Sequence, residues 1–120
     1  MKEFTQEDVA AAGQTIDSLI ARCEKIFPQF EDGTSQHTLL VNRLSALRVG
    51  QALMTRSDEV PLSRKELEAA RAPLASILHK CESAITKHAP GSVTYTKLEE
   101  QMRAMRVVLA CIEEMVAEME

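Results

Sequence analysis

The fold of this chain is decided by a stretch that occurs twice, as TQEDVAAAGQTIDSLIARCEK in residues 5–25 and, 58 positions later (63 − 5), as SRKELEAARAPLASILHKCES in residues 63–83. The correspondence continues without a gap, so that residues 5–58 lie on residues 63–116. Twelve of these 54 aligned pairs are identical, whereas unrelated helical stretches of this composition would share about five. Because the alignment crosses a turn in each half, we predict that a whole helical hairpin was duplicated.

Apolar residues recur at alternating steps of three and four in both copies, which is the pattern of an amphipathic helix packed in a bundle. Two such patterns span residues 9–30 and 37–54, and the second copy repeats them over 67–88 and 95–112. The connections are too short for anything but antiparallel neighbours. The sequence therefore predicts one all-α domain over residues 1–120, an up-down-up-down four-helix bundle of two tandem hairpins related by a pseudo-twofold axis. In this arrangement the first and third helices run parallel.

The starts of the first and third helices carry the same signal. Thr5 and Ser63 are residue types that cap helix N-termini, and each is followed three positions later by a carboxylate, Asp8 or Glu66. A capping box is expected at both places.

Proline and glycine mark where the helices end. Pro28 disfavours helical backbone just before it, and Asp32-Gly33 is typical of a turn. Residues 89–91, Ala-Pro-Gly, take that part in the second half, and residues 56–61 form the linker between the halves. The apolar pattern of the fourth helix continues to about residue 119, beyond the length of its counterpart.

Composition excludes several classes of partner. The net charge is −4, with no basic face of the kind that nucleic acid or an anionic membrane requires. No run of about eighteen apolar residues occurs. Three cysteines, an odd number, lie within helical patterns, which favours reduced thiols and a cytoplasmic location. We expect no nucleic-acid partner and no membrane partner.

The sequence holds no constellation for catalysis or metal binding. Cys23 and Cys81 correspond to each other, but no pair of histidines accompanies them to complete a zinc site. The Glu-x-x-His motifs of di-metal bundles and glycine-rich phosphate loops are both missing. We expect no enzyme activity, no catalytic residues, no metal and no cofactor.

Arg48 and Arg106 occupy matching positions beside the apolar seam of each half. Together with Gln51 they are candidate ligands for a small anion or carboxylate, since guanidinium groups bind carboxylates with two parallel hydrogen bonds. The alternative is that both guanidinium groups point outward to water or a carboxylate. Counting from the helix ends places Arg48 and Glu24 nearly 20 Å apart (about twelve residues at about 1.5 Å each), so no ion pair is expected between them.

The fourth helix carries a second apolar stripe beside the first, more apolar surface than one seam uses. The stripe consists of Ala104, Val108, Cys111, Met115 and Met119. It predicts a contact with a protein partner or with a second copy in a dimer, although the stripe can instead pack inside the monomer. The sequence thus favours a protein-interaction or assembly module acting through this helix, and alternatively a small-anion or carboxylate-binding protein using Arg48 and Arg106.

Overall fold

The computed structural model describes residues 4–55 and 62–119, and the expected linker at 56–61 lies outside these ranges. Four α-helices make up the described chain: α1 (Gln6–Ile26), α2 (Ser35–Thr55), α3 (Arg64–Ile85) and α4 (Val93–Glu118). A short 3₁₀ helix, η1 (Phe27–Gln29), follows α1 at the predicted proline. The predicted all-α four-helix bundle is confirmed.

The helix starts match the capping pattern. The Thr5 hydroxyl accepts a hydrogen bond from the Asp8 backbone N–H at 3.1 Å, and the Asp8 carboxylate accepts one from the Thr5 N–H at 3.0 Å. Ser63 and Glu66 form the same reciprocal pair at the start of α3. Each capping box satisfies two backbone donors that a helix start leaves without an intrahelical acceptor.

Each hairpin turn contains a glycine with positive φ, 85° at Gly33 and 88° at Gly91. Other residues rarely adopt this backbone conformation, because their Cβ would clash. The next residue, Thr34 or Ser92, then begins the following helix by accepting a backbone N–H three positions along, at 3.2 Å in both cases. The corresponding residues of the two halves therefore perform the same local task. The duplication itself stays a prediction.

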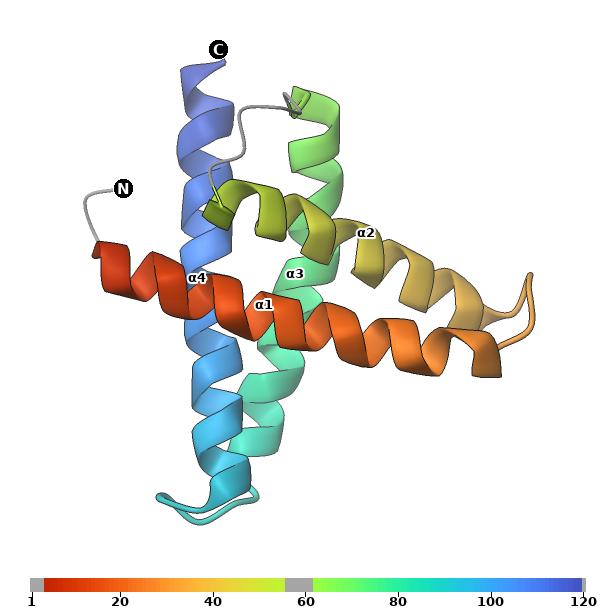
Figure 1. The fold of residues 1–120 in the computed structure, drawn as a ribbon, viewed down its shortest axis with the longest axis vertical. Helices are drawn as coiled ribbons and strands as arrows, with labels where there is room; N and C mark the ends of the chain where they lie inside the picture. Colours follow the sequence, from red (N-terminus) through yellow and green to blue (C-terminus); the bar gives the residue numbers. More distant parts are fainter. Residues whose placement is uncertain (1–3, 56–61, 120) are drawn as a thin grey trace.

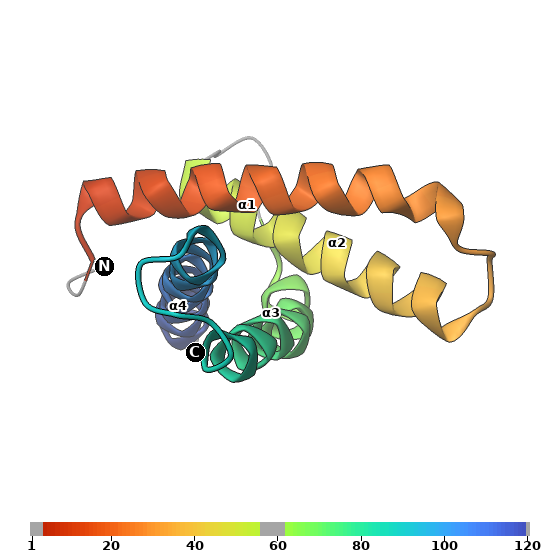
Figure 2. The same cartoon turned by 90° about the horizontal axis from the view of Figure 1, so that it is seen from below.

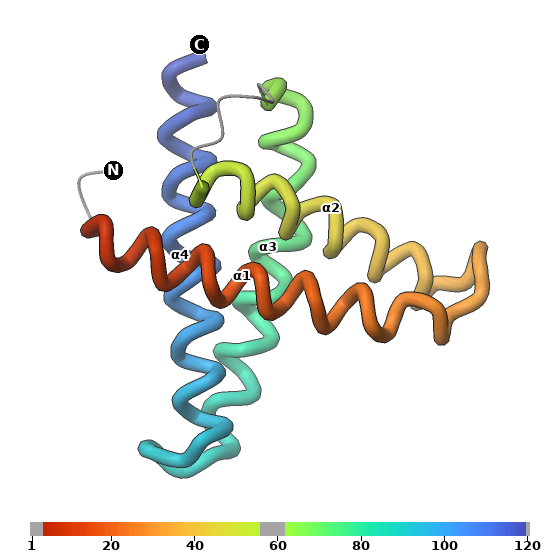
Figure 3. Tube along the Cα trace, viewed as in Figure 1, coloured from red at the N-terminus to blue at the C-terminus, as the bar shows by residue number. Residues whose placement is uncertain are grey.

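The two hairpins cross steeply instead of running side by side. In Figure 1 the α1–α2 hairpin runs from left to right and the α3–α4 hairpin runs vertically. Figure 2 shows the two hairpins as stacked layers. The tube in Figure 3 shows α1 passing over both α3 and α4. The molecule is accordingly broad and flat, with extents of 40 × 38 × 21 Å. The expectation that α1 and α3 run parallel is wrong, because apolar periodicity specifies which face of a helix is buried and not the angle at which two hairpins meet.

The core lies where the hairpins cross. Its largest fully buried side chains come from all four helices: Ile16, Leu47, Leu67, Leu74, Met105, Val107, Val108 and Ile112. Four buried alanines lie where helices of different hairpins meet: Ala12 and Ala104 between α1 and α4, Ala46 and Ala70 between α2 and α3. Their small side chains let the layers approach closely.

A close approach between the layers occurs at Gly50 of α2, which is buried against Val108 of α4. A Cβ atom at Gly50 would lie 3.2 Å from Cγ1 of Val108 and 3.4 Å from Cδ1 of Ile16. Gly50 and Val108 are corresponding residues, 58 positions apart (108 − 50). A twofold axis relating the hairpins would therefore pass between them.

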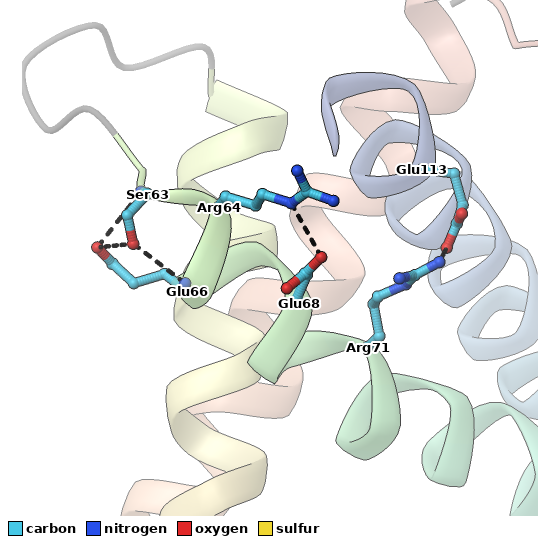
Figure 4. A network of polar contacts seen from close by, with 6 residues as sticks. All are labelled: Ser63, Arg64, Glu66, Glu68, Arg71 and Glu113. Atoms are coloured by element: carbon cyan, nitrogen blue, oxygen red, sulfur yellow. Dashed lines mark hydrogen bonds and ion pairs between the residues drawn. The ribbon is translucent and has the colours of Figure 1, made fainter. Parts of the chain in front are cut away.

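Polar contacts along the first turns of α3 are shown in Figure 4. They join Ser63 with Glu66, Arg64 with Glu68, and Arg71 with Glu113 of α4. The last pair joins the C-terminal part of α4 to α3. Glu113 corresponds to Thr55 in the first half, which is the last residue of α2. Because Arg71 and Glu113 are 41% and 56% exposed, their pair is expected to contribute no more than about 1 kcal/mol.

The crossing contact can be tested by overpacking. Gly50→Val is expected to lower the free energy of unfolding by roughly 1–3 kcal/mol, because its side chain has no room against Val108. Adding Val108→Ala should recover part of this loss. Gly13→Ala is the matched control: an added Cβ there meets Met54 Cβ at an ordinary 3.6 Å, so the better helix propensity of alanine should raise stability by about 0.5–1 kcal/mol. Urea unfolding followed by circular dichroism measures the free energy of unfolding of the wild type, the two single variants and the double variant. An unchanged free energy of unfolding in Gly50→Val would contradict the contact.

Candidate functional site

Arg48 and Arg106 form ion pairs within their own hairpins. Arg48 Nη2 lies 3.3 Å from Glu24 Oε2, and Arg106 Nη2 lies 3.4 Å from Glu82 Oε2. The expectation that Arg48 and Glu24 lie too far apart to pair is wrong. It assumed that α1 begins level with the end of α2, whereas the contact between Gly13 and Met54 places the end of α2 about two turns inside the start of α1. The extended arginine side chain spans the remaining offset.

Gln51 is held in a similar way. Its Nε2 donates to Oδ1 of Asp17 at 2.8 Å, across the α1–α2 hairpin. The two arginines are about half exposed, 56% at Arg48 and 51% at Arg106. The structure therefore places the three predicted ligand residues on hairpin surfaces, each with an intramolecular carboxylate, and none of them lines the cleft described below.

The predicted stripe on α4 divides between core and surface. Ala104 and Val108 are 1% and 0% exposed, which assigns them to the monomer interior instead of a partner contact. Their burial follows from the crossing, which lays α1 and α2 over the middle of α4. Cys111 and Met115 are partly buried, and Met119 is 43% exposed. Only the last turns of α4 can offer this stripe to a partner.

A cleft of about 290 Å³ lies between the two hairpins and is lined by residues from all four helices. Nine apolar or thiol side chains line it: Leu19, Cys23, Ile26, Leu40, Leu47, Ile77, Cys81, Ala84 and Leu98. Four polar residues complete the lining: Arg22, Arg43, Lys80 and Gln101. We call this the interhairpin cleft. It combines mostly apolar walls with a few polar groups, as small-molecule sites do.

The interhairpin cleft is built from corresponding positions of the two halves. Apart from Leu47, its lining residues form six pairs 58 positions apart: Leu19/Ile77, Arg22/Lys80, Cys23/Cys81, Ile26/Ala84, Leu40/Leu98 and Arg43/Gln101. One member of each pair comes from the α1–α2 hairpin and the other from the α3–α4 hairpin. The cleft therefore has two similar walls.

The cations of the interhairpin cleft have no acidic neighbours in its lining. Arg22, Arg43 and Lys80 line it, whereas no aspartate or glutamate does. Arg22 and Lys80 are exposed and Arg43 is half-buried. Within residues 4–55 and 62–119, none of these three side chains forms an ion pair. The lining itself thus contributes three cationic side chains and no carboxylate, although Glu24 and Glu82 lie close enough to act on Cys23 and Cys81.

Two buried thiols lie in opposite walls of the cleft. Cys23 and Cys81 are 7% and 5% exposed, and the Cys81 Sγ–H donates to Oε1 of Gln101 at 3.4 Å. Burial raises the pKa of both thiols, and the guanidinium of Arg43 opposes this rise at each of them. Both cysteines are therefore protonated at neutral pH and serve as apolar lining.

The sequence contained a signal for this cleft. Arg22 and Lys80 are cations at corresponding positions, each directly before a shared cysteine. The signal was not decisive, because the walls lie on different hairpins and come together only where the hairpins cross.

No three His, Cys, Asp or Glu residues of the described ranges lie close enough together to hold a metal ion. None of the described helices has the length and apolar character needed to cross a membrane.

Comparison with known proteins gives no relative: no protein-family model, no curated protein and no solved structure matches this chain.

The raised thiol pKa values predict a pH-dependent stability. Above about pH 8.5 the thiols ionise in the unfolded chain but stay protonated in the folded one, so the unfolded state binds fewer protons. The free energy of unfolding should therefore fall with rising pH, by up to about 1.4 kcal/mol per pH unit for each thiol, until the folded thiols ionise.

Urea unfolding between about pH 8 and 10.5 measures this slope. The Cys23→Ala/Cys81→Ala variant is the control, since its loss of packing shifts stability at every pH but removes the thiol contribution to the slope. Equal slopes in the two proteins would contradict the assignment.

Proposed function

We propose that this chain is a non-catalytic binding protein whose interhairpin cleft takes a small ligand with an apolar body and one negatively charged group. The observation that carries this proposal is the lining: apolar walls, no carboxylate, and three cations that form no ion pair with any residue of the described ranges. The proposal retains the carboxylate-binding alternative drawn from the sequence but moves it from Arg48 and Arg106 to Arg43, Arg22 and Lys80. A reducing cytoplasm, as expected from the sequence, would keep Cys23 and Cys81 as thiols.

The apolar walls supply most of the expected affinity. Each methylene group transferred from water to an apolar surface contributes about 0.8 kcal/mol when fully buried. The cleft is open on one side, so the gain per methylene is smaller than this limit. An unbranched alkyl chain suits walls of leucine, isoleucine and alanine, because the aromatic residues that would favour a flat ring are missing from the lining.

The half-buried Arg43 is the best candidate for the charged group of the ligand. A carboxylate can accept two parallel hydrogen bonds from its guanidinium, and partial burial strengthens that contact relative to water. Arg48 and Arg106 are less available, since each already pairs with a glutamate. The difference between paired and unpaired arginines thus supports the assignment.

Titration with decanoate tests this proposal. Below its micelle concentration, decanoate is expected to bind the protein at least about tenfold more tightly than decan-1-ol, because a charge-assisted hydrogen bond contributes about 1.5–3 kcal/mol. Arg43→Gln should abolish this preference while leaving the weaker binding of the alcohol unchanged. Isothermal titration calorimetry measures both affinities.

Arg48→Gln is the matched control, because it removes an arginine from the same helix outside the cleft. It should retain the preference for decanoate. The proposal fails if the wild-type protein does not bind decanoate, or if Arg48→Gln loses the preference as completely as Arg43→Gln does.

A second proposed function is self-association through the last turns of α4. It is supported by Met119, which is 43% exposed beside the partly buried Met115 and Cys111. A second copy of the chain would cover this apolar end in a dimer, in keeping with the closed twofold symmetry of most homo-oligomers.

Sedimentation equilibrium tests the dimer. The mass should rise above 13.3 kDa with protein concentration, and Met119→Lys should hold it at that value. Val93→Lys, which changes a 72% exposed apolar residue at the other end of α4, should associate like the wild type. A constant monomer mass in the wild-type protein would end this second proposal.

A further inference from the structure

We infer that the ligand of the interhairpin cleft lies in one direction, with its carboxylate on the α1–α2 wall at Arg43 and the end of its alkyl chain on the α3–α4 wall at Ala84. This inference rests on the proposed function. It makes the preferred ligand a straight-chain monocarboxylate and names the residues that set its direction and length.

The direction follows from where the two walls differ. Four of the six corresponding pairs are alike in kind, namely two apolar pairs, the shared cysteines and the exposed cations Arg22 and Lys80. A ligand meeting only these pairs would have no preferred direction. The two remaining pairs, Arg43/Gln101 and Ile26/Ala84, break the equivalence.

The first difference places the positive charge. Arg43 lines the cleft with both cysteines, and its guanidinium opposes the rise in pKa that burial causes at Cys23 and at Cys81, so it acts on groups in both walls. At the corresponding position, Gln101 is neutral, and its Oε1 accepts a hydrogen bond from the Cys81 thiol. A carboxylate therefore has a charged guanidinium partner on the α1–α2 wall and, at the matching point of the α3–α4 wall, only a neutral amide.

The second difference places the free space. The α1–α2 wall carries Ile26 where the α3–α4 wall carries Ala84, and both side chains are partly buried. The smaller alanine leaves room that the isoleucine fills in the other wall. An alkyl chain whose carboxylate lies at Arg43 extends toward that room, so Ala84 limits the chain length.

A reciprocal pair of variants tests the direction. Affinities for octanoate, decanoate and dodecanoate are measured by calorimetry in the wild type, in Ala84→Ile and in Ile26→Ala. Ala84→Ile should bind dodecanoate at least about tenfold more weakly while keeping its affinity for octanoate, because only the longer chain reaches residue 84. Retained octanoate binding also shows that the variant is folded. Ile26→Ala should not weaken dodecanoate.

A third variant removes the charge difference between the two walls. Gln101→Arg gives both walls an arginine at corresponding positions, so decanoate should then bind in both directions. Intermolecular nuclear Overhauser effects supply a direct reading: in the wild type the terminal methyl of decanoate should contact the Ala84 methyl and not those of Ile26, whereas in Gln101→Arg it should contact both.

The outcomes separate this inference from the proposed function. If no carboxylate binds the wild type, both fail. If decanoate binds but Ala84→Ile weakens octanoate and dodecanoate equally, or if the terminal methyl contacts Ile26, the direction is wrong and the binding function stands.

Discussion

The contact between Gly50 of α2 and Val108 of α4 is the constraint on which the rest of the molecule depends. With no side chain at residue 50, α2 lies directly on the valine methyl groups, and even a Cβ atom would reach 3.2 Å from one of them. Buried alanines on either side of this point keep the layers close. Since the hairpins touch at their crossing and diverge beyond it, the same contact that closes the core also opens the interhairpin cleft.

Charge is distributed differently on the hairpin surfaces and in the cleft. On the surfaces, Arg48 and Arg106 each pair with a glutamate 24 residues earlier in the chain, on the other helix of the same hairpin, at 3.3 and 3.4 Å. In the cleft, Arg22, Arg43 and Lys80 have no such partners among the residues that the structure describes. Exposed pairs of the first kind add little stability. Unpaired cations beside apolar walls are instead suited to a ligand that carries the missing charge, which connects the architecture to the proposed binding function.

Local features were predictable because their causes are local. The capping boxes at Thr5 and Ser63, the proline that ends α1 and the glycine turns all depend on residues within one or two helical turns of each other. The partner of Arg48 was not predictable in this way. Its distance from Glu24 depends on how far α2 slides along α1, and the count from the helix ends missed an offset of about two turns.

Hydrophobic periodicity, caps and turns in the amino-acid sequence specify four amphipathic helices in two hairpins, because these features act over short distances. The angle between the hairpins is a property of the folded molecule, and so are the burial of Ala104 and Val108 and the proximity of Arg43 to Cys81. These depend on side-chain packing between residues far apart in the chain, where one missing Cβ atom at Gly50 changes which surfaces can touch.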